Sequence, residues 1–222
     1  IWDNLEKKLF LSRDRFGEKP LFFTKYKKNL FFGSNINYIK TLSKRNFPIN
    51  EKKIINHLHY GFRSVGINNQ SYFSNIYELE KGTNFTINID NKIKKKRYWN
   101  IKKNKTLSKF EFKNVKKNLK KKIINAISSR LISDQPIACL LSGGVDSSII
   151  SNVAVKILKK DIKCYSIFNK NPNYSEFKQI DLNIKQLKCD HEYVNLFKKF
   201  SINEFEKIIK NLGYPISAKN FL

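Results

Sequence analysis

The front part of the chain alternates apolar and polar residues in short runs, a pattern typical of half-buried β-strands. Strands are expected over residues 5–12, 21–26, 30–33, 83–89 and 93–99. Asp90-Asn91 is a turn pair that would join the last two strands into a hairpin. Apolar residues at helical spacing predict two short helices, over residues 35–42 and 51–60. Residues 1–100 are therefore expected to be mainly antiparallel β-structure.

The pattern changes after a polar, lysine-rich stretch at residues 101–111, which is expected to link two domains. Apolar residues then recur at helical spacing over 112–131. Short apolar strands at 137–141, 162–168 and 191–196 alternate with helices at 149–159, 175–187 and 202–212. Alternation at these lengths predicts a parallel sheet, so residues 112–222 should form a second domain of a different architecture.

One stretch, Leu140 to Ser148, carries most of the candidate chemistry, and it reads Leu-Leu-Ser-Gly-Gly-Val-Asp-Ser-Ser. It follows a predicted strand and precedes an apolar segment at helical spacing. Gly143 and Gly144 allow positive φ angles and a close approach to a ligand. Ser147 and Ser148 are expected where a helix N-terminus presents free amide groups, which attract phosphates.

Side chains of this loop suit a nucleotide. Its hydroxyl groups, on Ser142, Ser147 and Ser148, can bind phosphate oxygens, and the Asp146 carboxylate can hold the Mg²⁺ that accompanies ATP. The loop lacks the lysine of a Walker A motif and does not fit Gly-x-Gly-x-x-Gly. The alternative interpretation is a purely structural glycine turn with a serine N-cap. Ligands of parallel sheets bind beyond the carboxyl ends of strands, where Ile167 would form an apolar wall for adenine or belong to the sheet core.

Composition narrows the class of protein. Of 222 residues, 41% are hydrophobic and 14% aromatic, which is enough for a folded core. The 44 lysines and arginines against 18 acidic residues give a net charge of +26, which raises the question of nucleic acid binding. Lysine greatly outnumbers arginine, and isoleucine and asparagine are abundant throughout, so composition bias is the preferred explanation.

The remaining sequence features point to the cytoplasm. No apolar run reaches the roughly 20 residues that a membrane span needs, and the N-terminus does not read as a signal peptide. The three cysteines, Cys139, Cys164 and Cys189, are isolated and are expected to be reduced core thiols. The three histidines, His57, His59 and His191, have no spacing typical of a metal site.

Three segments together resemble one family, the glutamine-dependent asparagine synthetases. Ile1 to Leu21, which contains Arg13-Asp14-Arg15-Phe16-Gly17-Glu18-Lys19-Pro20, is similar to the Arg-Asp-x-x-Gly-x-x-Pro-Leu segment late in the family's glutaminase domain. Arg97-Tyr98-Trp99 resembles the final strand of that domain. Asp134-Gln135-Pro136-Ile137 with Leu141 to Ser148, continuing to Tyr174-Ser175-Glu176 and Asp190-His191, resembles the ATP pyrophosphatase (PP-loop) synthetase domain with its Ser-Gly-Gly-x-Asp-Ser signature.

The resemblance implies a glutaminase portion of the N-terminal-nucleophile type, followed by a parallel-sheet ATP pyrophosphatase domain resembling the adenine nucleotide alpha hydrolases. It implies that glutamine supplies ammonia, that ATP with Mg²⁺ activates a carboxylate as an acyl-adenylate, and that aspartate is the default acceptor. Carried over by position, the ATP-binding residues would be Leu141, Ser142, Gly143, Gly144, Asp146, Ser147, Ser148 and Ile167, with Asp146 also binding the metal. Arg13 and Asp14 are expected to brace the fold. A homodimer is one option that the resemblance leaves open.

Some features depart from the family pattern. The catalytic cysteine is expected upstream of Ile1, so the sequence reads as part of a longer chain that would be inactive alone. Leu212-Gly213-Tyr214-Pro215 stands where many relatives have an acidic pair before proline, which leaves open an acceptor other than aspartate, as in surface-sugar or antibiotic pathways. Two other classes also stay open: an RNA-modifying PP-loop enzyme, and a basic binding module whose glycine loop is only structural.

Overall fold

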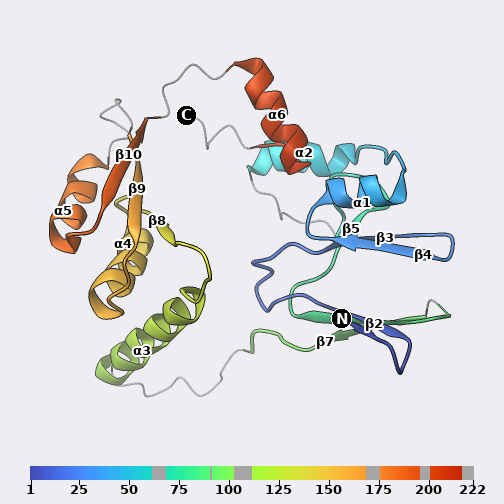
Figure 1. Cartoon of the computed structure of the whole chain (residues 1–222), viewed down its shortest axis with the longest axis horizontal. Coiled ribbons are helices and arrows are strands. Elements are labelled where there is room, and N and C mark those ends of the chain that lie inside the picture. The colour runs from blue at the N-terminus through green and yellow to red at the C-terminus, as the bar shows by residue number, and fades with distance from the viewer. Residues whose placement is uncertain (62–68, 91, 103–111, 169–175, 196–200, 217–222) are drawn as a thin grey trace. The chain divides into compact units, whose positions relative to one another are not determined.

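The computed structural model describes residues 1–61, 69–90, 92–102, 112–168, 176–195 and 201–216. The chain divides into two compact units, one of Ile1–Lys103 with Ser201–Leu222 and the other of Asn104–Phe200. The first contains antiparallel sheets and the second a parallel sheet (Figure 1). The expected change of architecture along the chain is confirmed. Most of the predicted linker, residues 103–111, lies outside the described residues.

Where the structure describes the first unit, its strands form two antiparallel sheets. One has the order β1-β2-β6-β7, with β1 (Trp2–Asp3), β2 (Lys8–Ser12), β6 (Thr83–Asn88) and β7 (Ile93–Arg97). The other has the order β4-β3-β5, with β4 (Asn29–Gly33), β3 (Phe22–Tyr26) and β5 (Tyr77–Glu78). In the short strand β1, Trp2 pairs with Leu9 and Asp3 with Lys8, although the alternating pattern predicts a strand only from residue 5. A two-residue strand has no period of its own, so only its partner reveals it.

The burial of β6 follows the alternation that its sequence predicts. Thr83, Phe85 and Ile87 are buried, and the residues between them are half-buried. Its neighbour β7 is exposed along its whole length and carries three consecutive lysines. Such a charged edge strand resists pairing with another chain. The three lysines therefore belong to a solvated edge of the sheet.

The described residues of the first unit include the helices α1 (Ile36–Ser43), α2 (Glu51–Tyr60) and α6 (Ile202–Leu212). The side chains of Asn35 and Asn50 cap the first two helices, and Ser201 forms a capping box on the third. Although α6 follows the parallel sheet in sequence, its last carbonyls accept hydrogen bonds from Asn37, whose Nδ2 lies 2.7 Å from the Lys210 oxygen. It therefore packs on residues that lie far earlier in the chain.

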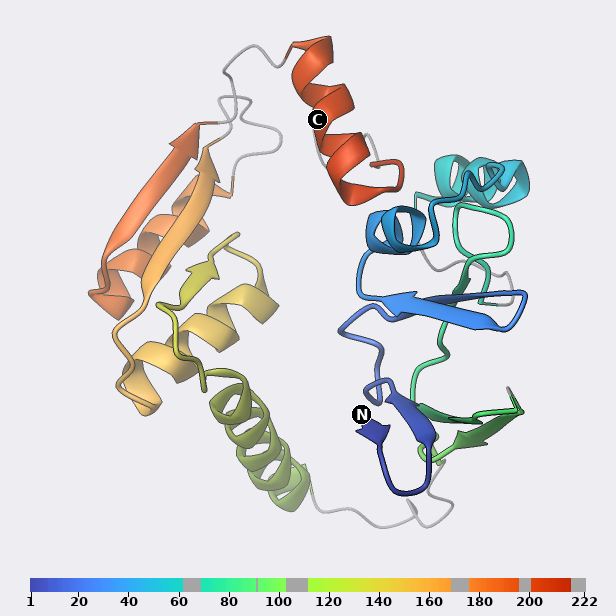
Figure 2. The ribbon, with the colours of Figure 1, turned by 45° about the vertical axis from the view of Figure 1, so that its right-hand side comes forward.

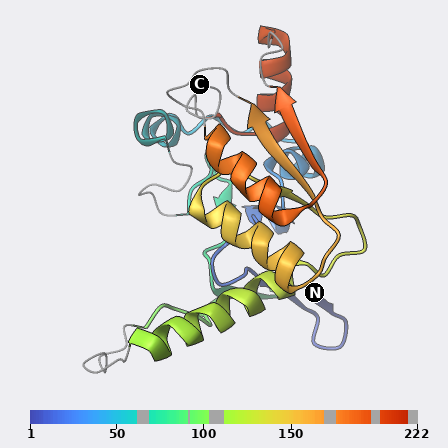
Figure 3. The same ribbon diagram turned by 90° about the vertical axis from the view of Figure 1, so that its left-hand side faces the viewer.

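The second unit contains three parallel strands in the order β10-β9-β8 (Figure 2). They are β8 (Ala138–Leu140), β9 (Lys163–Phe168) and β10 (His191–Asn195). The helices are α3 (Phe112–Arg130), α4 (Val145–Asn152), which continues as the π-helical segment η2 (Val153–Ile157), and α5 (Phe177–Leu187). In Figure 3, α4 and α5 lie next to each other against one face of the strands. The parallel sheet predicted from the alternating pattern is confirmed.

The core of the second unit lies under these helices. Its buried residues include Leu141, Ala154, Cys139 and Cys164. All three cysteines are free, and burial raises the pKa of the Cys139 and Cys164 thiols. The expectation of reduced core thiols is confirmed for these two, while Cys189 is partly buried beside them. Among the described residues, no helix is long and apolar enough to cross a bilayer.

Candidate functional site

The candidate phosphate loop, Ser142 to Ser148, begins at the carboxyl end of β8 and runs into α4. The Leu141 N–H group donates to the Tyr165 carbonyl oxygen at 2.8 Å, which ties the residue just before the loop to β9. The helix begins at Val145, four residues earlier than expected, with Gly144 as its N-cap. Ser147 and Ser148 are therefore not caps but the third and fourth helical residues. Asp146, Ser147 and Ser148 interrupt the apolar spacing after Val145, so the pattern predicted a helix only from Ile149 onward.

The two glycines of the loop differ in conformation. Gly143 has a φ of +84°, and a Cβ atom there would lie 3.1 Å from the Glu176 Cβ and 3.2 Å from the Gln179 Cβ. Gly144 has a φ of −69°, so the expected positive φ is wrong for this residue. A Cβ on Gly144 would meet only the Ser142 hydroxyl, at 3.3 Å. Gly143 is thus required by both its backbone angle and its contact with the start of α5.

The serine hydroxyls close the loop on itself. The Ser142 N–H donates to the Ser147 Oγ at 3.2 Å, and the two hydroxyl oxygens lie 3.0 Å apart. Ser147 and Ser148 both donate to the Gly144 carbonyl oxygen, at 3.1 Å and 2.7 Å. These bonds hold the loop's shape before any ligand binds. The first amides of α4 have no partner within the helix, and their dipole favours an anion at this end.

The other predicted site residues lie around this loop in different environments. Leu141 is 1% exposed and packs in the core, so only its backbone is available at the strand end. Ile167 is 55% exposed, on the opposite face of the sheet from the helices. Asp146 is exposed at the second position of α4. Among the described residues, no group of three or more His, Cys, Asp or Glu side chains could hold a metal.

Sequence reasoning assigned no role to Ser166 and His191, which the structure connects to the loop. The Ser166 hydroxyl donates to the Leu141 carbonyl oxygen at 2.5 Å, and the His191 Nε2 atom lies 2.9 Å from the same hydroxyl. Two sequence features could have drawn attention to these residues: Ser166 is a serine within a mainly apolar strand, and His191 belongs to the Asp190-His191 pair that resembles the family. Neither signal shows that the two side chains meet.

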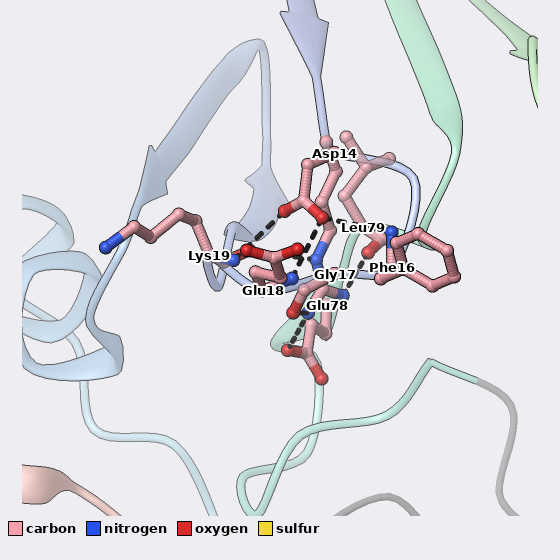
Figure 4. A network of polar contacts seen from close by, with 8 residues as sticks. Asp14, Phe16, Gly17, Glu18, Lys19, Glu78 and Leu79 are labelled. Atoms are coloured by element: carbon pink, nitrogen blue, oxygen red, sulfur yellow. Dashed lines mark hydrogen bonds and ion pairs between the residues drawn. The ribbon is translucent and has the colours of Figure 1, made fainter. Parts of the chain in front are cut away.

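The first unit holds the Arg13–Pro20 loop through one buried guanidinium. Arg13 Nε donates to the Lys19 carbonyl oxygen at 3.0 Å, and Nη1 donates to the Leu79 carbonyl oxygen at 2.5 Å. Nη2 donates to the Gly17 carbonyl oxygen at 3.1 Å and pairs with the Glu78 carboxylate at 2.8 Å (Figure 4). This side chain ties the loop to β5, which confirms the bracing role expected for it.

Asp14 stabilises the same loop by accepting hydrogen bonds from its backbone (Figure 4). Its carboxylate accepts hydrogen bonds from the backbone N–H groups of Phe16, Glu18 and Lys19, at 2.9–3.0 Å. Burial alone would raise the pKa of Asp14, but these N–H groups lower it below its ordinary value. Both residues of the Arg-Asp pair thus hold the backbone, as expected.

The Arg97-Tyr98-Trp99 segment meets this loop directly. The Tyr98 hydroxyl donates to the Arg13 carbonyl oxygen at 2.8 Å, and the Phe16 and Trp99 rings pack edge to face at 4.9 Å. Two of the three segments that carry the family resemblance are therefore in contact within one unit. Arg13, Glu78, Glu80 and Arg97 line a cavity of about 430 Å³ there.

Glu80 makes the stability of the first unit dependent on pH. Its carboxylate pairs with Lys95 and, at 2.9 Å, with Arg97. The hydrogen bond from Lys95, opposed by burial and aided by Asn69 and Arg97, lowers the pKa of Glu80 from 4.5 to about 2. The stabilisation is therefore complete above pH 4.5 and is lost as the pH falls towards 2. Because the network is partly exposed, we expect it to contribute about 1 kcal/mol.

The measurement is urea unfolding of wild type and Glu80→Gln at several pH values, followed by tryptophan fluorescence. The two unfolding free energies should differ at neutral pH and converge in acid. Glu18→Gln changes an exposed carboxylate of the same unit and is the control. A difference that does not shrink as the pH is lowered would contradict this assignment.

Comparison with known families defines the class of protein: the front part of the chain matches glutamine amidotransferase domains and the later part matches asparagine synthases. Residues 1–99 match the family described as glutamine amidotransferase domain, and residues 118–220 match the family described as asparagine synthase. The chain belongs to the asparagine synthase family. The antiparallel and parallel parts correspond to these two matches, which confirms the expected fold class.

Individual relatives agree with this assignment. Asparagine synthetase [glutamine-hydrolyzing] 3 of Bacillus subtilis is 30% identical over 78% of this chain and 28% of its own length. Asparagine synthetase [glutamine-hydrolyzing] 1 of the same organism is 26% identical over 98% of this chain and 33% of its own length. Proteins named as amidases also match, at lower identity. The chain spans between a quarter and two fifths of the first four curated relatives, from 26% to 40%.

One solved structure is also similar, the NH3-dependent NAD synthetase of Campylobacter jejuni. It shares 14% identity with a TM-score of 0.31, over 46% of this chain and 42% of that chain. This score is too low to support an argument about the site.

Proposed function

We propose that this chain is part of an ATP-dependent amidotransferase of the asparagine synthase type. In that reaction aspartate, glutamine, ATP and water give asparagine, glutamate, AMP and pyrophosphate. The observation that carries the proposal is the Ser142–Ser148 loop. The loop lies at the carboxyl end of a parallel strand, and hydrogen bonds made by its own hydroxyl groups hold it together. Gly143 has a left-handed backbone conformation and packs against the start of α5, and no side chain of a described residue caps the N-terminus of α4.

The chemistry requires a site that stabilises pyrophosphate as a leaving group. A carboxylate oxygen attacks the α-phosphorus of ATP, and the bond to the β-phosphate oxygen breaks, which yields an acyl-adenylate and pyrophosphate. Ammonia released from glutamine then attacks the acyl carbon, AMP leaves, and the amide forms after loss of a proton. Positive potential at the start of α4 favours the charge that develops on the departing pyrophosphate.

Each predicted residue then has a role consistent with its position. The backbone of Ser142, Gly143 and Gly144 and the hydroxyls of Ser147 and Ser148 would surround the phosphates. The exposed Ile167 would form the apolar wall for the adenine, and Leu141 would contribute its backbone alone. Since Ser147 and Ser148 already bond the Gly144 carbonyl through their single protons, they can only accept from an incoming group or exchange this bond for a phosphate oxygen.

Asp146 fits a magnesium ion that is shared with phosphate. Magnesium uses oxygen ligands, and in nucleotide sites one or two carboxylates commonly suffice because phosphates and water complete the octahedron. The Asp146 carboxylate is exposed beside the open end of α4. When bound, the ion would neutralise phosphate charge and orient the triphosphate.

Titration calorimetry of the 222-residue chain with pyrophosphate and with ATP tests this proposal. Binding is expected at the loop and should tighten when Mg²⁺ is added. Asp146→Asn should remove most of that Mg²⁺ effect, about 10-fold in affinity, and change binding without Mg²⁺ much less. Asp161→Asn, an exposed carboxylate elsewhere in the same unit, is the matched control. If Asp146→Asn keeps the full Mg²⁺ effect, Asp146 is not the metal ligand.

The carboxylic acid that receives the amide nitrogen has to be identified in a separate measurement. Aspartate is the acceptor that we propose, since several relatives of this chain are named as asparagine synthetases. Acid-dependent release of pyrophosphate from ATP should be measured in the protein that carries this chain, with aspartate and with a panel of other carboxylic acids. Release with another acid but not with aspartate would assign a different acceptor and keep the amidotransferase class.

A further inference from the structure

Ser166 and His191 are the strongest unassigned feature in the part of the chain that the structure describes. Ser166 is only 1% exposed, yet its side chain is polar and lies between two neighbouring strands. Burying a hydroxyl is costly unless both its donor and its acceptor functions are used. Here one hydrogen bond joins Ser166 to Leu141, the residue that follows β8, and the other joins it to His191 of β10.

The direction of these bonds follows from their chemistry. The Ser166 hydroxyl has one proton, which it donates to the Leu141 carbonyl oxygen at 2.5 Å, because a carbonyl can only accept. The His191 Nε2 atom, 2.9 Å from the same hydroxyl, must then be the donor. The imidazole therefore carries its proton on Nε2, and the hydroxyl is fixed by one bond given and one received.

Burial favours the neutral form of His191. Burial lowers the pKa of His191 below its ordinary value and outweighs the opposing effect of the Asp181 and Asp190 carboxylates. The His191 ring packs edge to face against Tyr193 at 4.6 Å. The Tyr193 hydroxyl donates to Asp181 of α5 at 2.8 Å. The imidazole is thus held in place from β9, β10 and α5.

The hydrogen bond from Ser166 to the Leu141 carbonyl oxygen also fixes the orientation of the Ser142 N–H group. The Leu141 C=O and the Ser142 N–H belong to the same planar peptide unit, so fixing one fixes the other. The Ser142 N–H donates to the Ser147 Oγ at 3.2 Å, and Ser147 in turn donates to the Gly144 carbonyl at 3.1 Å. A continuous series of hydrogen bonds therefore runs from His191 through Ser166 and one peptide plane into the phosphate loop.

We propose that Ser166 and His191 are positioning residues that orient the Leu141–Ser142 peptide and thereby the loop that holds the phosphates of ATP. This inference rests on the proposed function of the loop. The two residues do not contact the nucleotide themselves. Their effect on it passes through the peptide plane and the Ser147 hydroxyl.

The test compares variants that remove or keep the Nε2 donor. His191→Gln keeps an N–H group near the position of Nε2, whereas His191→Leu has a similar bulk and no donor. Pyrophosphate affinity of the full chain, measured at a temperature where every variant is folded, should fall about 3- to 10-fold in His191→Leu and in Ser166→Ala. His191→Gln should bind close to wild type. The double variant Ser166→Ala/His191→Leu should bind no worse than Ser166→Ala alone, because both changes break one series of bonds.

Ser151→Ala is the matched control for loss of a buried hydroxyl. Ser151 is fully buried in the same unit, and its hydroxyl donates to the Ser147 and Ser148 carbonyl oxygens within α4. A loss of affinity in Ser151→Ala as large as in Ser166→Ala would show a general packing effect and overturn the proposal. Additive losses in the double variant, or no rescue by His191→Gln, would overturn it as well.

A measurement without ligand separates this inference from the proposed function. Amide hydrogen exchange at Ser142 and Gly143 should be faster in Ser166→Ala than in wild type, and unchanged in Ser151→Ala. If wild type binds pyrophosphate while Ser166→Ala and His191→Leu bind equally well, positioning is wrong and the nucleotide site stands. If wild type binds neither pyrophosphate nor ATP, the proposed function fails whatever the exchange data show.

Discussion

Gly143→Ala should abolish measurable pyrophosphate binding and destabilise the second unit by about 2–4 kcal/mol. The backbone at this residue has a φ of +84°, which alanine adopts only with strain. Its Cβ would also lie 3.1 Å and 3.2 Å from the Cβ atoms of Glu176 and Gln179, and 3.2 Å from the Glu176 carbonyl oxygen. None of these atoms is the free end of a flexible side chain, so the loop or α5 must move.

Gly144→Ala is the matched control, because the same methyl group is added one residue later. Its φ of −69° suits alanine, and the nearest atom is the Ser142 hydroxyl at 3.3 Å. We expect a change in unfolding free energy below about 1 kcal/mol. Both tryptophans, Trp2 and Trp99, belong to the first unit, so hydrogen exchange of peptides from β8 and β9 is the suitable stability measurement for the second. Equal stability of the two variants would contradict the role assigned to Gly143.

Arg13→Lys should destabilise the first unit by about 2–4 kcal/mol. The guanidinium reaches three backbone carbonyls and one carboxylate from a single planar group, and the side chain is only 12% exposed. An ammonium group has a different shape and cannot reach all four acceptors at once. Some of the carbonyls on Gly17, Lys19 and Leu79 would then lose their partner, and each buried unpaired carbonyl is costly.

Urea unfolding followed by tryptophan fluorescence measures this effect, since Trp99 packs on the same loop through Phe16. Arg15→Lys makes the same substitution at an exposed position two residues away, and should change the unfolding free energy by less than about 0.5 kcal/mol. If both variants unfold at the same urea concentration, the Arg13 network does not brace the unit.

Elements with strong local signals were predicted closely. The predicted helix at residues 51–60 matches α2, because Asn50 caps it and Gly61 ends it in the left-handed conformation. The alternation in β6 predicted which side chains are buried. The glycine-serine loop was placed correctly between a strand and a helix for the same reason, since glycine, serine and apolar spacing act within a few residues.

Local signals were insufficient where distant residues decide the structure. The start of α4 was misplaced because Asp146, Ser147 and Ser148 interrupt the apolar spacing of its first turn. The two glycines of the loop were not distinguished, because their different φ angles and the approach of α5 to Gly143 appear only in the folded structure. The roles predicted for Asp146 and Ile167 stay predictions, because only a bound metal ion or nucleotide would show whether these side chains contact it.

The sequence by itself determined the order of the helices and of the longer strands, the family and the position of the phosphate loop, because these depend on periodicity and on contiguous motifs. Only the tertiary structure decided that Ser166 and His191 support that loop and that α6 packs on residues of the first unit. Leu141, Ser166 and His191 are spaced 25 residues apart, so their hydrogen bonds depend on the register of three parallel strands. That register forms only when the sheet and its covering helices pack together.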